Sequence, residues 1–198
     1  IRQGLSSELP GQKAQNRMVP NLPMGKQIRG TPNSFTRSSA VLILLYPNHS
    51  SIYTILIKRA TYNGTHSGQV SFPGGKQEVS DRDLTHTALR EAHEEIGIDP
   101  ADISVMGSLT PLFIPVSNLL VLPVIGLLAQ KPELHLDLHE VEFCIHVNIM
   151  DFTDPSKRAV KTFESHQHQI KAPFYRVEGE DVWGATAMII AEFTELYS

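Results

Sequence analysis

Three glutamates stand close together in the sequence, at Glu91, Glu94 and Glu95. In a helix of 3.6 residues per turn, this spacing puts all three on one face. Like charges at this spacing repel by roughly 0.2–0.5 kcal/mol per exposed pair, and one arginine, Arg90, cannot neutralise three carboxylates. A divalent cation can, and grouped oxygen ligands suit Mg²⁺ or Mn²⁺. The alternative is an acidic helix face exposed to solvent, which is what most runs of charge are.

A glycine-rich turn precedes these glutamates, in the run Ser71-Phe72-Pro73-Gly74-Gly75-Lys76. The run reads as a strand that ends in a tight turn. Glycines at such a turn let the backbone approach a phosphate, and free amides and carbonyls can face a ligand. The alternative is an ordinary turn without a ligand. Together the turn and the glutamates indicate chemistry on a phosphorylated substrate.

A helix from Leu84 to Gly97 is expected to position the glutamates. Its apolar residues recur every four positions and form one stripe: Leu84, Ala88, Ala92 and Ile96. We expect Ser80 or Asp81 to cap its start, and Gly97 to end it in a left-handed conformation. The glutamate face borders the apolar stripe, so the carboxylates should lie near the seam between the helix and the core.

Short apolar runs elsewhere predict strands, and the first two are joined by a loop with turn chemistry. The predicted strands are Ala40–Tyr46, Tyr53–Lys58, Gln69–Phe72, Ile103–Leu109, Leu119–Leu128 and Phe143–Val147, followed by a hairpin over residues 159–176. Residues Val182–Tyr197 predict a closing helix. Because strands and helices alternate, we expect an α/β fold with a mixed sheet.

Charge is unevenly distributed along the chain of 198 residues. Residues 1–37 carry six basic residues and one acid, a net charge of +5, whereas residues 38–198 carry a net charge of −9. The first segment is rich in proline and has little periodicity, so we interpret it as an arm with at most one short helix, and 38–198 as the folded domain. The arm either has a structural role or helps to hold an anionic substrate.

The run from Gly75 to Ile98 resembles the Nudix box. Its second half, Arg90-Glu91-Ala92-His93-Glu94-Glu95-Ile96-Gly97-Ile98, matches the family pattern at every specified position. The first half is one residue longer than the common box, and the position of the early acid falls on Arg82, so Asp81 or Glu78 substitutes for it. This longer spacing is familiar in the coenzyme A pyrophosphatases of the family.

An upstream signature of that subgroup is also similar. It is matched in register by Ile55–Ala60, by Gly68 and by Phe72–Gly75, with two departures. Ile57 replaces a threonine, and Gly64 stands where a second arginine belongs. The missing arginine removes a phosphate contact, which makes ADP-ribose, a dinucleotide or another nucleoside diphosphate derivative the alternative substrate.

The resemblance implies an α/β/α sandwich that hydrolyses a nucleoside diphosphate linked to another moiety. Coenzyme A would be cut at its pyrophosphate into 3′,5′-ADP and 4′-phosphopantetheine. Mg²⁺ or Mn²⁺ would be held by Glu91, Glu94, Glu95 and the carbonyl of Gly75, with Arg90 orienting the glutamates and Glu94 or Glu140 as the general base. Implied substrate-binding residues are Arg59, Gly68, Phe72, Gly74 and Lys76.

Composition narrows the remaining possibilities. A net charge of −4 gives no basic field for nucleic acid, and no apolar run is long enough to span a membrane. A single cysteine, Cys144, rules out a disulfide framework and suits a reducing compartment, so we expect a cytoplasmic protein. The family similarity implies a homodimer. A nucleotide sensor without hydrolysis is a third hypothesis, although it would not need three glutamates.

Overall fold

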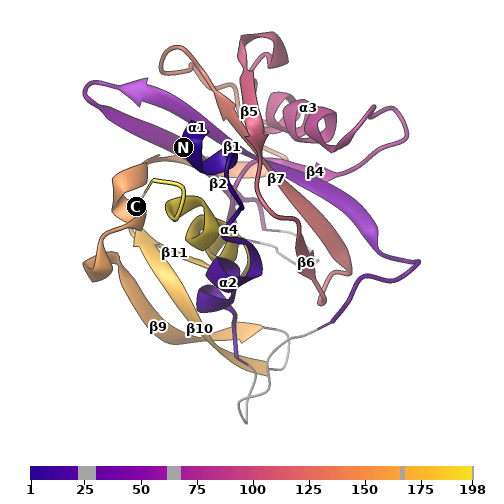
Figure 1. Cartoon of the computed structure of the whole chain (residues 1–198), viewed down its shortest axis with the longest axis vertical. Coiled ribbons are helices and arrows are strands. Elements are labelled where there is room, and N and C mark those ends of the chain that lie inside the picture. The colour runs from indigo at the N-terminus through magenta and orange to yellow at the C-terminus, as the bar shows by residue number, and fades with distance from the viewer. Residues whose placement is uncertain (22–29, 62–67, 166–167, 198) are drawn as a thin grey trace.

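The computed structural model describes residues 1–21, 30–61, 68–165 and 168–197, and Figure 1 labels its elements. The helices are α1 (Arg2–Leu5), α2 (Gly11–Gln15), α3 (Leu84–Ile96) and α4 (Gly184–Thr194), with short 3₁₀ turns at Asn16–Met18, Pro100–Asp102, Ile149–Phe152 and Pro155–Lys157. The strands are β1 (Arg37–Asn48), β2 (Ser51–Arg59), β3 (Val70–Ser71), β4 (Gly74–Lys76), β5 (Ser104–Ser108), β6 (Leu112–Ile114), β7 (Leu119–Leu127), β8 (Val141–Asn148), β9 (Arg158–Ser165), β10 (His168–Val177) and β11 (Glu180–Trp183).

Strand β1 is the centre of the large sheet. It pairs in parallel with β7 and antiparallel with β2 and β4, while β2 also pairs with β3 and β8. Strands β5 and β6 lie antiparallel to β7. The sheet is therefore mixed, as the sequence predicts.

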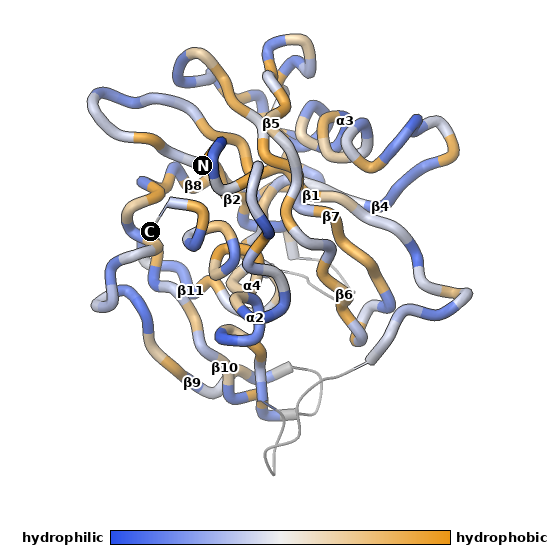
Figure 2. Tube along the Cα trace, viewed as in Figure 1, coloured by the Kyte–Doolittle hydropathy of each residue, from blue (hydrophilic) through white to orange (hydrophobic). Residues whose placement is uncertain are grey.

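The two faces of β1 pack against different helices. Its even-numbered residues, such as Leu42 and Leu44, pack with Ala88 and Ala92 of α3, whereas its odd-numbered residues, such as Ile43, pack on the side of α4. Figure 1 shows the large sheet between these two helices, and Figure 2 shows apolar residues concentrated in its strands. This arrangement confirms the predicted α/β/α sandwich.

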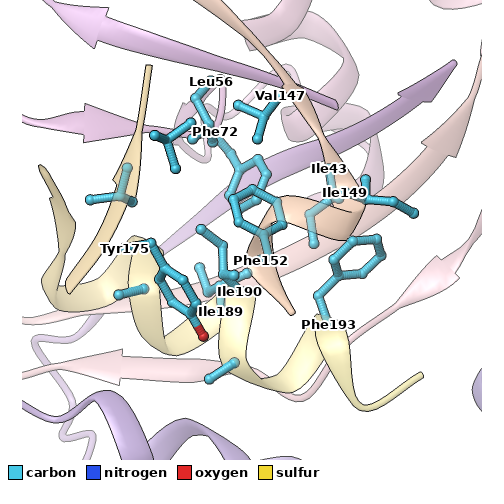
Figure 3. Packing of buried hydrophobic residues seen from close by; sticks show 14 of the residues in the cluster. Ile43, Leu56, Phe72, Val147, Ile149, Phe152, Tyr175, Ile189, Ile190 and Phe193 are labelled. Carbon is cyan, nitrogen blue, oxygen red and sulfur yellow. The ribbon is translucent and has the colours of Figure 1, made fainter. Parts of the chain in front are cut away.

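The larger core lies between the sheet and α4. Figure 3 shows Ile189, Ile190 and Phe193 of α4 close to Phe152 and Tyr175, and all five are buried. Tyr175 belongs to β10, the middle strand of a second sheet formed by β9, β10 and β11. The hairpin predicted over residues 159–176 is thus confirmed. The second sheet packs against α4 on the side away from the large sheet.

The N-terminal segment is more ordered than expected, because α1, α2 and a 3₁₀ turn replace the single short helix. Ala14 and Met18 are buried, and Met18 belongs to the larger core. The side chain of Glu192 on α4 is fully buried and accepts hydrogen bonds from Gly11 N (3.1 Å), Gln15 Nε2 (2.8 Å) and Thr110 N (3.1 Å). These bonds fasten α2 to α4.

The starts of the two longest helices differ from the sequence prediction. Asp83, rather than Ser80 or Asp81, caps α3 by accepting from His86 N, and Gly97 ends the helix at a φ of 75° as expected. Helix α4 begins at Gly184, because Val182 and Trp183 pair with β10. None of the helices in the described residues is long and apolar enough to cross a membrane.

Candidate active site

A cavity of about 980 Å³ opens where α3, the β4 turn and α4 come together. Its lining combines charged and apolar side chains. The charged residues are Arg37, Arg59, Lys76, Glu78, Arg90, Glu91, Glu94 and Glu140. The apolar residues include Val41, Phe72, Ile114, Val116, Leu119, Val121, Ala185 and Ile189. Ligand sites of this volume hold substrates of cofactor size.

The glycine turn brings the backbone against α3. Gly74 has a φ of 154°, and a Cβ there would lie 2.3 Å from the carbonyl oxygen of Ala40. At Gly75 a Cβ would lie 2.3 Å from the Glu91 carboxylate. Only glycine therefore lets Glu91 lie directly against this turn. The carbonyl of Gly75 accepts from Ser39 Oγ at 2.6 Å, and its second lone pair stays available to a ligand.

Glu95 points away from the cavity and into the protein. Its side chain is 1% exposed and accepts from Gly74 N (2.8 Å) and Arg59 Nη1 (2.9 Å). Burial raises the pKa of Glu95 to about 7, although the Arg59 charge and the Gly74 amide act in the opposite direction. In this structure Glu95 fixes the glycine turn.

Arg90 is surrounded by carboxylates. It binds both oxygens of Asp81 (Nε–Oδ1 2.9 Å, Nη2–Oδ2 3.1 Å), and it also donates to Glu91 Oε1 (2.9 Å) and Glu94 Oε2 (2.7 Å). The Asp81 side chain is fully buried, and the bonds from Arg90 hold its pKa well below the usual range. Asp81, one of the two candidates for the early acid of the box, is thus held by Arg90.

Arg59 contacts the two carboxylates that Arg90 does not bind, those of Glu95 and Glu140. Its guanidinium lies 2.9 Å from Glu95 and 3.7 Å from Glu140. The Glu140 side chain is 53% exposed and lines the cavity, where the loop before β8 places it next to the end of β2. Glu140 is thus brought to the same cavity as Glu91 and Glu94, although it lies far from them in the sequence.

The structure brings most of the predicted site residues to this cavity. Its lining includes Arg59, Phe72, Gly74, Gly75, Lys76, Arg90, Glu91, Glu94 and Glu140, but neither Glu95 nor Gly68. Arg17, from the basic arm that the sequence offers as a holder of an anionic substrate, contacts Glu195 and the carbonyl of Ala191. Gly64 and Lys26 lie outside the described residues.

Other lining residues have no distinctive sequence pattern. Arg37, Ser39 and Ser117 line the cavity, as do three residues of α4. Alternation along β1 could have found Arg37, because it shares a face with Ser39 and Val41. Trp183 does not line the cavity but stacks on Phe163, with ring centroids 4.4 Å apart.

The donors at the cavity suit a hard divalent cation. Glu91, Glu94, Glu140 and the Gly75 carbonyl offer oxygen atoms, and burial raises the pKa of Glu91. Within the described part of the chain, no three acidic, histidine or cysteine side chains are grouped closely enough to hold an ion. In the structure the carboxylates are bound by Arg90 and Arg59. The residue types fit Mg²⁺ or Mn²⁺. The positions of these carboxylates in the structure are those in which Arg90 and Arg59 bind them.

An α/β/α sandwich in which a glycine turn lies against a glutamate-bearing helix defines the Nudix class of proteins. The chain belongs to this family, since the model of the NUDIX domain matches residues 36–144. It is 38% identical over 161 residues to Nudix hydrolase 15, mitochondrial, of Arabidopsis thaliana, a match that covers 78% of this chain and 56% of that relative. The chain thus spans little more than half of that protein.

A second relative is matched over more of its length. The chain is 34% identical over 154 residues to a bacterial protein named uncharacterized Nudix hydrolase NudL, from Pectobacterium atrosepticum, covering 78% of this chain and 79% of the relative. Among solved structures, a MutT/nudix family protein from Enterococcus faecalis aligns with a TM-score of 0.52 at 14% identity, covering 85% of this chain and 64% of that one. This likeness supports the fold.

Proposed function

We propose that this chain hydrolyses the pyrophosphate bond of a nucleoside diphosphate derivative, and that coenzyme A is its substrate. The observation that carries the proposal is the cavity itself, whose lining combines carboxylates and cations with apolar side chains. Coenzyme A has the matching halves, a charged nucleotide diphosphate and a longer, less polar pantetheine arm. The match of residues 55–75 to the coenzyme A signature supports the same choice.

In this proposal Glu91, Glu94 and the carbonyl of Gly75 hold Mg²⁺ or Mn²⁺. The bound ion would neutralise the negative charge of the pyrophosphate and so make phosphorus easier to attack. Arg90 orients Glu91 and Glu94 through the hydrogen bonds described above. Lys76, next to Gly75 on the cavity wall, binds a phosphate oxygen.

Glu140 is the better placed general base. Glu94 is committed to Arg90 at 2.7 Å, whereas among the described residues the Glu140 carboxylate has the longer contact of 3.7 Å to Arg59. Glu140 would take a proton from the attacking water, whose oxygen bonds to phosphorus as the bridging P–O bond breaks. The products are 3′,5′-ADP and 4′-phosphopantetheine.

Product analysis with coenzyme A, ADP-ribose and NADH in parallel tests this function. We expect 3′,5′-ADP and 4′-phosphopantetheine from coenzyme A, with the highest kcat/KM of the three. Activity should need added Mg²⁺ or Mn²⁺ and disappear when a chelator is present. Full turnover in a metal-stripped, chelated sample would reject the metal part of the proposal, and binding without products would indicate a sensor.

A second candidate is hydrolysis of ADP-ribose or a dinucleotide. The observation that favours it is Gly64, which replaces an arginine of the coenzyme A signature. Faster turnover of ADP-ribose than of coenzyme A would promote it. A homodimer and a cytoplasmic location stay predictions, and the Arabidopsis relative is named mitochondrial.

A further inference from the structure

Alternate residues of β1 run along the cavity away from the glutamates. Arg37, Ser39 and Val41 all line it. Ser39 lies at the catalytic end, because its hydroxyl donates to the Gly75 carbonyl. Since a strand rises about 3.3 Å per residue, the backbone of Arg37 is roughly 7 Å farther along the cavity. Arg37 therefore faces a different part of a bound substrate from the part that the glutamates contact.

The turn between β6 and β7 holds this end of β1 in place. Arg37 N donates to Asn118 O (3.1 Å), and the Asn118 side chain accepts from Thr36 Oγ1 (2.8 Å) and donates to Phe35 O (3.1 Å). Asn118 has a φ of 50°, a conformation that asparagine tolerates better than most residues. These bonds fix the backbones of Arg37 and Ser117 relative to each other before any ligand binds.

Two polar groups at this end have no protein partner among the described residues. The hydroxyl of Ser117 is buried without a hydrogen bond, whereas Arg37 is exposed and its guanidinium makes no hydrogen bond or ion pair with a described residue. A buried hydroxyl without a partner is costly and calls for an explanation. Both groups donate hydrogen bonds and both line the cavity, so an anionic oxygen of a ligand would satisfy Ser117 and take the place of water at Arg37.

The other arginines of the cavity are already committed to carboxylates. Arg59 contacts Glu95 and Glu140, and Arg90 contacts three acids. Lys76 lies next to Gly75, at the end where the pyrophosphate is expected. Among the described cations that line the cavity, Arg37 is thus in position to bind an additional anionic group of the substrate.

We propose that Arg37 and Ser117 form a second anion subsite that binds a phosphate monoester of the substrate, apart from the pyrophosphate that is cleaved. This inference rests on the proposed function and sharpens it. Coenzyme A carries such a group, the 3′-phosphate, whereas dephospho-coenzyme A and ADP-ribose do not. The subsite would therefore select coenzyme A even though Gly64 removes one arginine of the family signature.

Ligand binding tests the subsite without requiring turnover. We would measure by calorimetry the affinities of 3′,5′-ADP and AMP for the wild type and for Arg37→Met, Ser117→Ala and Arg2→Met. The wild type should prefer 3′,5′-ADP at least tenfold, as expected for one charge-assisted hydrogen bond. Arg37→Met should lose this preference while binding AMP normally, and Ser117→Ala should reduce it. Arg2→Met, on exposed α1, should behave like the wild type.

Kinetics separate the subsite from the proposed function. With coenzyme A and dephospho-coenzyme A as substrates, Arg37→Met should raise KM for coenzyme A alone. Lys76→Met should raise KM for both substrates by the same factor. If 3′,5′-ADP is preferred through Arg37 but coenzyme A is not cut, the proposed function fails and the subsite stands. If coenzyme A is cut but the wild type shows no preference, or Arg37→Met keeps it, the subsite is refuted and the function stands.

Discussion

Two arginines determine where the carboxylates of the cavity point. Arg90 binds Asp81, Glu91 and Glu94, while Arg59 binds Glu95 and Glu140. Without these pairs, like charges at helical spacing would repel each other. Each arginine also leaves its carboxylates with free lone pairs, because a carboxylate can accept several bonds. The same residues thus stabilise the fold and prepare oxygen ligands for a cation.

Glu95→Gln tests the residue that the structure places inside the protein. In glutamine one of the two carboxylate oxygens that accept from Arg59 and Gly74 N becomes an NH₂ donor. The glycine turn should therefore loosen and displace the Gly75 carbonyl from the ion. We expect kcat to fall by about 10²-fold or more, measured by steady-state kinetics. Glu142→Gln, an exposed change on β8, is the matched control. A loss of less than threefold would make Glu95 a purely structural residue.

The lowered pKa of Asp81 predicts how the free energy of unfolding changes in acid. Because its folded pKa is lowered, its ionised form stabilises the fold above the unfolded pKa of about 4, and this contribution is lost as pH falls toward the folded pKa. Asp81→Asn should therefore lower the free energy of unfolding at pH 7 by about 1.5–3 kcal/mol. It should also lose less stability than the wild type between pH 5 and pH 3.

Urea unfolding at both pH values measures this difference. Asp102→Asn, at an exposed position, is the control and should follow the wild type. Equal acid sensitivity of the wild type and Asp81→Asn would show that the Asp81–Arg90 pair does not stabilise the fold in this way.

At the scale of elements, the turn at β4 is set by two neighbouring glycines with different constraints. A Cβ added at Gly74 would collide with the backbone of β1, whereas a Cβ added at Gly75 would collide with the end of a flexible side chain, Glu91. Gly75→Ala should therefore fold but push the Glu91 carboxylate aside, with a loss in kcat of at least about tenfold. Gly74→Ala should instead destabilise the fold by about 2–4 kcal/mol or prevent folding.

Melting temperature and kcat, measured on both variants, separate the two effects. The explanation fails if Gly75→Ala keeps full activity, or if Gly74→Ala is as stable as the wild type. The pair of variants thus distinguishes a glycine needed by the site from a glycine needed by the sheet.

At the scale of the whole molecule, the N-terminal segment is joined to the core through α4. Glu192 receives three hydrogen bonds there, two of them from α2, and Arg17 pairs with Glu195. Residues 1–21, the first part of this basic segment, therefore lie against the folded domain. A division at residue 37 stays a prediction about folding units.

Glu192→Ala tests this connection. It leaves three donors without a partner in the interior, so the free energy of unfolding should fall by about 2–4 kcal/mol, measured by urea titration. Limited proteolysis should cut within residues 1–18 sooner than in the wild type. Glu195→Ala removes only a half-exposed ion pair and should cost less than about 1 kcal/mol. Equal effects of the two changes would contradict the proposed anchoring role of Glu192.

Local patterns determined much of this protein in advance. The four-residue repeat from Leu84 to Ile96 predicts α3, and Gly97 ends it as expected. Apolar runs predict β1, β2, β7 and β8, because burial on both faces of a sheet leaves a continuous apolar signature. The short strands β4, β6 and β11 are not predicted, since so short a run has no measurable period, whereas β3 lies within the predicted strand Gln69–Phe72.

Only the tertiary structure decided how the side chains of the cavity are paired. Sequence spacing places Glu91, Glu94 and Glu95 on one helix face, but the turn at Gly74 draws Glu95 inward and leaves the other two at the cavity. Likewise, Arg37 and Ser117 are 80 positions apart in the sequence, and the parallel pairing of β1 with β7 brings their backbones together. Such contacts depend on strand register and burial over long separations, which local periodicity does not encode.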